Sequence, residues 1–343
     1  MTEVTIRGAG IFGLSIAWEC VCRGARVRVI DPHGVAAGSS GGIVGALAPH
    51  VPENWNPKKA FQFESLLMAQ GFWGAVEDAS GMPSGYARSG RLQPVPDDAA
   101  LDLAAQRAAN AVTLWQGKAT WELVRTGKEP WAPNSPSGWL IKDTLSAHLH
   151  PRKACEALAT ALKVKGVTIE KDGPNRGAVV WATGVAGLEA LNTGRSRSVG
   201  AGIKGQAALL SYDMRGAPQL FADTVHIIPH FDGTVAVGST SERVFDAPDT
   251  TDAQLDLVLE KARAAVPALR IAPCLATWAG VRPRARSRAP MLGRWPDRPN
   301  HFIANGGFKI GFGMAPKVAQ VMADLVLDGA DTIPTGFEVA ASL

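Results

Sequence analysis

The sequence predicts an α/β protein of two interleaved domains, one built on a Rossmann-like parallel sheet and the other an α+β domain built on an antiparallel sheet. One observation behind this prediction is a strand, a glycine turn, a helix and a second strand within the first thirty residues. The other is a hairpin pattern at 225–240, which lies between glycine-rich segments typical of the first domain. A chain of 343 residues is long enough for two domains.

The glycine turn near the N-terminus is typical of a dinucleotide-binding site. It follows a short apolar strand at 4–6 and precedes a helix that we expect to end at Gly24. Gly8 permits the tight turn, Gly10 lets the backbone approach a pyrophosphate, and Gly13 lets the helix pack closely on the strand. The N-terminus of the helix would then offer backbone N–H groups to the phosphates.

The residues after this turn indicate which dinucleotide is bound. A second strand, at 26–30, ends at Asp31, and an acid at this position can accept hydrogen bonds from a ribose 2′-hydroxyl. From Ala36 to Ala48 the residues are small, where an NAD-dependent dehydrogenase would have another strand and helix. Small residues let the backbone lie against a flat, extended ligand. The pattern therefore disfavours a plain NAD-dependent dehydrogenase.

Three later segments contain further motifs. Residues 178–184 (Ala-Val-Val-Trp-Ala-Thr-Gly) predict a buried strand and a turn, and residues 280–293 contain Gly-Val-Arg-Pro and then Ala-Pro-Met-Leu-Gly. Residues 305–316 are rich in glycine, so the backbone there can approach a planar ring. We expect a helix over 317–327, with its positive N-terminus near that ring.

With these motifs in order, the chain resembles the D-amino-acid oxidase and glycine oxidase superfamily of FAD enzymes. The resemblance includes the Ser-Ser-Gly run at 39–41 and Gly-Ala-Leu-Ala-Pro at 45–49. It implies a glutathione-reductase-type FAD-binding domain with a non-covalently held cofactor, because no cysteine follows Cys274 in the position that some relatives use. The FAD-binding residues that it implies are Gly8, Gly10, Ile11, Phe12, Gly13, Asp31, Pro32, Ser39, Ser40, Gly45, Ala46, Ala182, Thr183, Gly184, Arg282, Gly306, Gly307, Phe308, Lys309 and Ile310.

The resemblance also implies a reaction, the oxidation of the C–N bond of a small amine or amino acid by hydride transfer to flavin N5. The electron acceptor would be oxygen or an electron carrier. Arg282 is the candidate anchor for a substrate carboxylate, since a guanidinium matches a carboxylate in two hydrogen bonds. The alternative for Arg282 is a structural ion pair.

Three further residues are candidates for contact with the substrate. Lys309 matches a basic position of glycine oxidases, although it could be a solvated loop lysine. His226 stands where the superfamily has Tyr in Tyr-Ile-x-Pro, and it could replace that Tyr, mark a different substrate, or face solvent. His50, after the turn at 45–49, is a weaker candidate near the flavin.

The spacing of the motifs predicts how the chain is divided. The FAD-binding domain is expected to consist of residues 1–75, 151–198 and 274–343, and the substrate domain of residues 76–150 and 199–273. Within the second domain, we expect helices at 98–114 and 252–266.

Two other functions remain open. The arginines of a row at 282, 284, 286 and 288 would share one face of a strand, and parts of the sequence resemble the flavin oxidase half of a tRNA wobble-uridine modification enzyme. The chain could also be an FAD-binding, electron-transferring subunit whose tryptophans mark an interface with a partner; otherwise they belong to the core or substrate pocket. These tryptophans are Trp115, Trp121, Trp131 and Trp139.

Composition narrows the setting of the protein. The net charge of +4 is low for a nucleic-acid-binding protein, so nucleic acid is a disfavoured partner that stays possible. No apolar run is long enough for a membrane span. The four cysteines do not have a disulfide-framework or zinc spacing, so we expect no metal and a cytoplasmic location.

Overall fold

The computed structural model describes residues 2–343, so the first residue of the predicted segment 1–75 lies outside it. Residues 2–343 contain a six-stranded sheet, an eight-stranded sheet and a two-stranded sheet. The six-stranded sheet has the order β15 (Met291–Arg294), β16 (His301–Asn305), β9 (Ala178–Trp181), β1 (Glu3–Arg7), β2 (Arg26–Ile30) and β8 (Thr168–Glu170).

The first sheet is the Rossmann-like part of the molecule. Its strands are parallel except β15, which pairs antiparallel with β16 at the edge. Parallel neighbours need crossover connections. The helix α1 (Ile11–Cys22) connects β1 to β2, and α4 (Pro151–Val164) lies in the connection from β2 to β8. Two further helices, α5 (Gly184–Asn192) and α7 (Gly311–Ala323), follow β9 and β16. The predicted strand, glycine turn, helix and strand at the N-terminus are confirmed as β1, α1 and β2.

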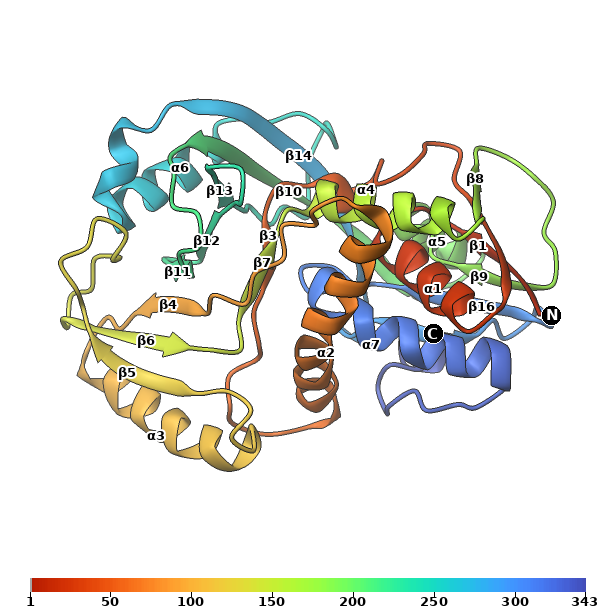
Figure 1. Cartoon of the computed structure of the whole chain (residues 1–343), viewed down its shortest axis with the longest axis horizontal. Helices are drawn as coiled ribbons and strands as arrows, with labels where there is room; N and C mark the ends of the chain where they lie inside the picture. Colours follow the sequence, from red (N-terminus) through yellow and green to blue (C-terminus); the bar gives the residue numbers. More distant parts are fainter. Residues whose placement is uncertain (1) are drawn as a thin grey trace.

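The second sheet lies on the other side of the molecule (Figure 1). Its order is β14 (Cys274–Ala285), β10 (Gly200–Ser211), β13 (Thr234–Gly238), β12 (Val225–Pro229), β11 (Gln219–Ala222), β4 (Arg91–Pro94), β6 (Trp139–Asp143) and β5 (Trp121–Arg125). It is antiparallel except for the pairing of β11 with β4. The predicted hairpin is confirmed as β12 and β13, where His226 lies opposite Gly238. The predicted α/β class with two sheets is therefore confirmed.

Residues 274–285 form β14, a strand of the second sheet that pairs along its length with β10. The strand leaves this sheet only after residue 285. The division by residue number assigns the segment to the FAD-binding domain, and that assignment stays a prediction, as do the other boundaries.

Three of the expected features concern helices on the second sheet and at the C-terminus. The helix at 98–114 is α3 (Asp98–Leu114), and the helix at 252–266 is α6 (Gln254–Ala265). The expected helix at 317–327 is wrong at its start, because α7 begins at Gly311 and contains Pro316. Its buried face packs against α1, and this packing offsets the cost of an internal proline.

The long helix α2 (Pro57–Ser80) was not predicted. Its start has a recognisable signal, because the Asn56 side chain accepts a hydrogen bond from the Lys59 N–H at 3.1 Å and Pro57 occupies the first turn. Gly81 ends it in the left-handed conformation. Through its buried face α2 packs on α7 and α4. The other short elements are β3 (Gly45–Leu47), β7 (Ala147–Leu149), η1 (Ser39–Gly41), η2 (Pro267–Ile271), η3 (Asp324–Asp328) and η4 (Val339–Ser342).

The tryptophans of the second domain belong to its core. Trp115 is fully buried, with its ring centroid 6.0 Å from that of Trp121, and Trp131 stacks on Tyr212 at 6.4 Å. Trp139 is half-buried beneath the Arg125 guanidinium. The core interpretation of these residues is therefore confirmed, and the partner-interface interpretation loses its support. Among residues 2–343, no helix combines the length and apolarity that crossing a membrane would require.

Candidate functional site

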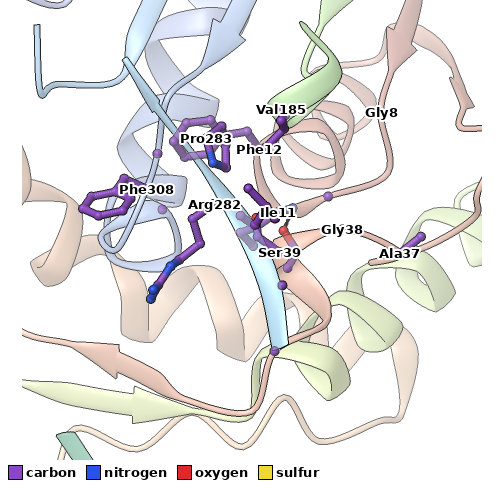
Figure 2. Close-up of a pocket in the computed structure, with 18 of the residues that line it drawn as sticks. Gly8, Ile11, Phe12, Ala37, Gly38, Ser39, Val185, Arg282, Pro283 and Phe308 are labelled. Atoms are coloured by element: carbon purple, nitrogen blue, oxygen red, sulfur yellow. Dashed lines mark hydrogen bonds between the residues drawn. The ribbon is translucent and has the colours of Figure 1, made fainter. Parts of the chain in front are cut away.

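A cavity of about 720 Å³ extends from the first sheet to the second. Its size lies in the range of small-molecule and cofactor sites, about 300–1,000 Å³. Figure 2 shows Ala37 and Gly38 near one end of the lining and Arg282 and Phe308 near the other, with Ile11 and Ser39 between them. One end of the cavity therefore lies at the first sheet, where a nucleotide would bind, and the other end lies at the second sheet.

The glycine turn between β1 and α1 forms one wall of the cavity. Gly8 has φ +111°, and a Cβ there would lie 2.3 Å from the Ala182 carbonyl oxygen. A Cβ at Gly13 would lie 1.9 Å from the Gly8 carbonyl oxygen, so this glycine allows α1 to pack on the turn. Gly10 lines the cavity and leaves open the space that a side chain would occupy.

The carboxylate of Asp31 is held beside this turn by two backbone groups. The Ala9 N–H donates to its Oδ2 at 2.8 Å, and the His33 N–H donates to its Oδ1 at 2.9 Å. Asp31 also lines the cavity. Each carboxylate oxygen can accept more than one hydrogen bond, so Asp31 retains acceptor capacity for a ribose hydroxyl.

Three helices point their N-termini at the cavity. The first residues of α1 line it, as do Gly184 at the start of α5 and Gly311 at the start of α7. Each N-terminus has the positive end of a helix dipole and free backbone N–H groups. Such an arrangement favours a ligand with distributed negative charge, such as a pyrophosphate. The start of α7 at Gly311, not near Pro316, is what brings this third helix to the cavity.

The glycines at the far end allow close packing around Phe308. A Cβ at Gly307 would lie 2.9 Å from the Phe12 ring, and one at Gly306 would lie 2.7 Å from the Ala285 side chain. The Phe308 N–H donates to the Pro283 carbonyl at 3.0 Å, and Phe308 itself has φ 44°. A bulky residue adopts this conformation only where its surroundings impose it, as they often do at functional sites.

Arg282 is the buried cation at this end. It is 9% exposed and has no ion pair with any carboxylate in the described part of the chain, so the structural ion pair is not its role. Its Nη1 donates to Ser239 Oγ at 2.7 Å, and its Nη2 donates to the Thr240 carbonyl at 2.7 Å and the Lys204 carbonyl at 3.4 Å. A guanidinium has five N–H donors, so Nε and one further N–H lack an acceptor.

The surroundings of Arg282 fix its position and change its acidity. A Cβ at Gly205 would lie 1.9 Å from its Nη2, so only glycine leaves room for the guanidinium. Burial lowers the pKa of Arg282 to about 10, against the opposing influence of Glu242. Glu242 is occupied by others, since Gln206 donates to it at 3.0 Å and the Lys204 ammonium lies 3.7 Å away. Arg282 therefore stays a cation near neutral pH.

His226 and Lys309 lie at the same end of the cavity. Burial, with the charges of Arg91, Lys309 and Arg282, lowers the pKa of His226 to about 3. The imidazole is therefore neutral at physiological pH, and its Nδ1 is enclosed without a partner. Lys309 keeps contact with solvent, but the protein around its ammonium and the charge of Arg282 lower the pKa of Lys309 to about 8.

Most of the residues that the sequence suggested line this cavity. They are Gly8, Gly10, Ile11, Phe12, Asp31, Pro32, Ser39, Ser40, Ala46, Ala182, Thr183, Gly184, His226, Arg282, Gly306, Gly307, Phe308 and Lys309. Gly13, Gly45 and Ile310 lie behind the lining: Gly45 lets β3 approach the Leu149 carbonyl, and Ile310 precedes α7. The structure does not place His50 in the cavity, because its backbone N–H and its ring contact Gln62 Oε1 instead.

Among the lining residues that were not selected from the sequence are Trp278 and Ser239. Trp278 projects from β14 over Gly42, and a Cβ at Gly280 would lie 2.4 Å from its ring. The available signal was the alternation of Trp278 and Gly280 two positions apart, just before the arginine. Ser239 follows β13 and receives the Arg282 hydrogen bond, a contact between distant segments that the sequence does not reveal.

The arginine row presents less surface than expected. Arg282 and Arg284 do share a face, and both guanidinium groups lie over the Phe308 ring, at 5.6 and 5.7 Å from its centroid. The strand ends at Ala285, so Arg286 and Arg288 do not continue that face. Half of the row therefore belongs to the cavity end and not to an exposed basic strip.

The sheet order, the glycine turn and the cavity define the chain as a dinucleotide-binding α/β protein with a second sheet at the reactive end. The open cradle at Gly10, the converging helix N-termini and the enclosed Nδ1 of His226 fit an extended cofactor with a charged centre. A family model described as FAD dependent oxidoreductase matches residues 3–325. The chain belongs to this family, DAO.

Relatives of known name support this assignment at low identity. The bifunctional protein ThiO/ThiG of Nostoc sp. (strain PCC 7120) is 27% identical over 351 residues, which cover 95% of this chain and 53% of that protein. The chain thus spans about half the length of such bifunctional relatives. Glycine oxidase of Bacillus subtilis (strain 168) is 23% identical, covering 95% of this chain and 93% of the enzyme.

Solved structures confirm the fold. Glycine oxidase from Geobacillus kaustophilus superposes with a TM-score of 0.82 at 20% identity, over 99% of both chains. L-proline dehydrogenase from P. horikoshii gives a TM-score of 0.80 at 21% identity, over 98% of this chain and 96% of that one.

Proposed function

We propose that this protein oxidises the C–N bond of a small amine or amino acid and passes the electrons to oxygen or to an electron carrier. FAD, when bound, supplies a flavin ring that accepts a hydride from the substrate carbon. The predicted cofactor residues that line the cavity would hold it, with Asp31 at the ribose and the three helix N-termini near its negative charge. We also propose non-covalent attachment, as in the sequence analysis.

The observation that carries this proposal is the buried Arg282 guanidinium at the cavity end. Its neighbours are a hydroxyl and backbone carbonyls, all neutral, so its charge is balanced by no direct contact. A substrate carboxylate would provide that balance and use the free donors. Because Ser239 and Thr240 hold the side chain, the carboxylate would be positioned as well as bound.

His226 would contact the substrate as a neutral imidazole. With a pKa of about 3 it is a weak proton acceptor near pH 7, so it is not a general base for the substrate ammonium. It would instead offer one hydrogen bond, in the place where the superfamily has a Tyr hydroxyl. The amine then has to arrive neutral or lose its proton to water, and the rate should rise with pH without an inflection from this histidine.

The direct test is the visible spectrum of the purified protein during anaerobic addition of single amines and amino acids. We expect flavin absorbance bands that bleach with at least one of them. Flavin bands that no amine bleaches would contradict the proposed reaction while leaving the cofactor in place. The absence of flavin bands after reconstitution with FAD would contradict the cofactor site.

Lys309 leads to a prediction about pH. The charged groups around it are Arg282 on β14 and Lys261 on α6, which is paired with Asp223, while His226 on β12 is neutral. A protonated Lys309 attracts an anion. The affinity for a carboxylate should therefore be high at pH values below 8 and should fall as the pH rises through about 8. Acetate, which has no amine to titrate, can be followed by its perturbation of the flavin spectrum between pH 6 and pH 9.

The control for this titration is Lys309→Arg, which keeps its charge throughout. In that variant we expect an acetate dissociation constant that does not change near pH 8. A wild-type inflection that persists in the arginine variant would contradict the role of Lys309.

We also propose that the protein lies in the cytoplasm, on the cysteine composition given above.

A further inference from the structure

A second cavity, of about 370 Å³, adjoins the first and is not used by the reaction proposed above. The two share Ser239 and Lys309 in their linings. One wall of the second cavity is α6, and the others are the turn before β12 and the segment after β13. Its lining also includes Gln254, Leu257, Val258 and Lys261. A substituent that extends from a substrate bound at Arg282 could therefore enter the second cavity.

The lining of the second cavity suits a polar substituent with an aliphatic stem. Hydroxyl groups and an amide provide hydrogen bonds, while Val258 and Leu257 provide apolar contact. Leu257 is 58% exposed, so its side chain is accessible to a bound substituent. Lys261 adds a cation whose Nζ lies 3.3 Å from Asp223 Oδ2 at the surface.

The charges at the junction of the two cavities are unbalanced. Neither Arg282 nor Lys309 forms an ion pair within residues 2–343. The acid whose charge acts on Arg282 is Glu242. Its carboxylate already interacts with Lys204, Gln206 and Thr240. One substrate carboxylate would bring a single negative charge to these two cations, so one positive charge would stay unbalanced. A second negative group on the same substrate would balance both cations.

We propose that the substrate carries a second anionic group, which lies in the second cavity between Lys309 and Lys261. The substrate class is an amino acid or N-substituted glycine whose substituent ends in a carboxylate. This inference rests on the proposed amine oxidation, because Arg282 must hold the first carboxylate. It assigns substrate specificity to α6 and the segment after β13.

The first experiment compares two substrates of equal shape with the FAD-loaded protein. N-(2-carboxyethyl)glycine carries the second carboxylate, and N-(3-methylbutyl)glycine replaces it with an isosteric apolar group. We expect a KM about tenfold or more lower for the dianionic compound, the usual size of a charge-assisted hydrogen bond. An equal or lower KM for the apolar compound would overturn the proposal. If neither compound nor any member of the amine and amino-acid panel reduces the flavin, the proposed function itself fails. Reduction by glycine or another panel member without any gain from the second carboxylate refutes only this inference.

The second experiment changes the cavity. Leu257→Trp should fill it and lower kcat/KM for N-(2-carboxyethyl)glycine about tenfold, with glycine turnover unchanged. Glu260→Trp is the matched control, since it adds the same side chain at an exposed position of the same helix outside the cavity. Lys261→Met should weaken binding of the dianionic compound and leave the apolar one unaffected. Equal effects on glycine and on the extended substrate would contradict the assignment.

Discussion

Replacement of Arg282 by methionine is expected to lower kcat/KM for a carboxylate-bearing amine by about 100- to 1,000-fold, because losing a buried charge partner costs about 3–4 kcal/mol. Methionine keeps much of the side-chain volume and removes the charge and every N–H donor. Most of the loss should appear in KM, with a further loss in kcat if the carboxylate also orients the substrate. The measurement is steady-state or anaerobic half-reaction kinetics of the FAD-loaded variant.

Two controls separate substrate binding from folding in this experiment. Arg282 also donates to Ser239 and Thr240, so the variant must retain flavin absorbance and its melting temperature to be informative. An amine without a carboxylate should be oxidised at an unchanged, if low, rate by both proteins. Arg282→Lys keeps the charge but loses the two-pronged geometry, and we expect an intermediate activity. A methionine variant with wild-type kinetics on glycine would refute the anchor.

Substitutions at two glycines of one turn are expected to have different effects, one on the stability of the fold and the other on cofactor binding. Gly8→Ala places a methyl group 2.3 Å from the Ala182 carbonyl oxygen in a backbone conformation with φ +111°. The resulting strain and overpacking should reduce the free energy of unfolding by about 3 kcal/mol or more. Thermal unfolding of the FAD-free protein measures this effect directly.

Gly10→Ala should have the opposite profile. Its backbone, with φ −86° and ψ −177°, is open to any residue, and the new Cβ meets only Ser40 Oγ at 3.1 Å. The fold should survive, but the methyl group would enter the space beside the pyrophosphate position. We expect FAD affinity to fall by about 10- to 100-fold, as for a clash that costs about 1.5–3 kcal/mol. A Gly10→Ala protein that retains FAD through dilution as the wild type does would contradict the assigned cofactor position.

Much of the cofactor half of the molecule was predictable, because its signals are local. The turn requires glycine at Gly8 for its backbone conformation and at Gly13 for a close contact, so the residue types themselves reveal the geometry. Asp31 was predictable because it comes directly after a strand whose sequence pattern is recognisable. The hairpin of β12 and β13 likewise follows from alternation and a turn.

The features that were missed depend on contacts between distant segments. The start of α7 at Gly311 is stabilised by packing against α1 and α2, which outweighs the local signal of Pro316. His50 follows the predicted glycine-rich turn, yet Gln62 of α2 holds it away from the cavity. The membership of β14 in the second sheet depends on its pairing with β10, in which Gly200 lies opposite Ala285.

The sequence by itself determined the fold class, the dinucleotide turn and the residue types that form the site, because these depend on short-range sterics and on hydrophobic patterning. Only the tertiary structure decided which charges face one another. It placed the cations Arg282 and Lys309 near the neutral His226. It also paired Glu242 with Lys204 and Gln206, and it formed a second cavity against α6. Charge balance and burial are sums over residues brought together from the whole chain, so they exist only once the two sheets have met.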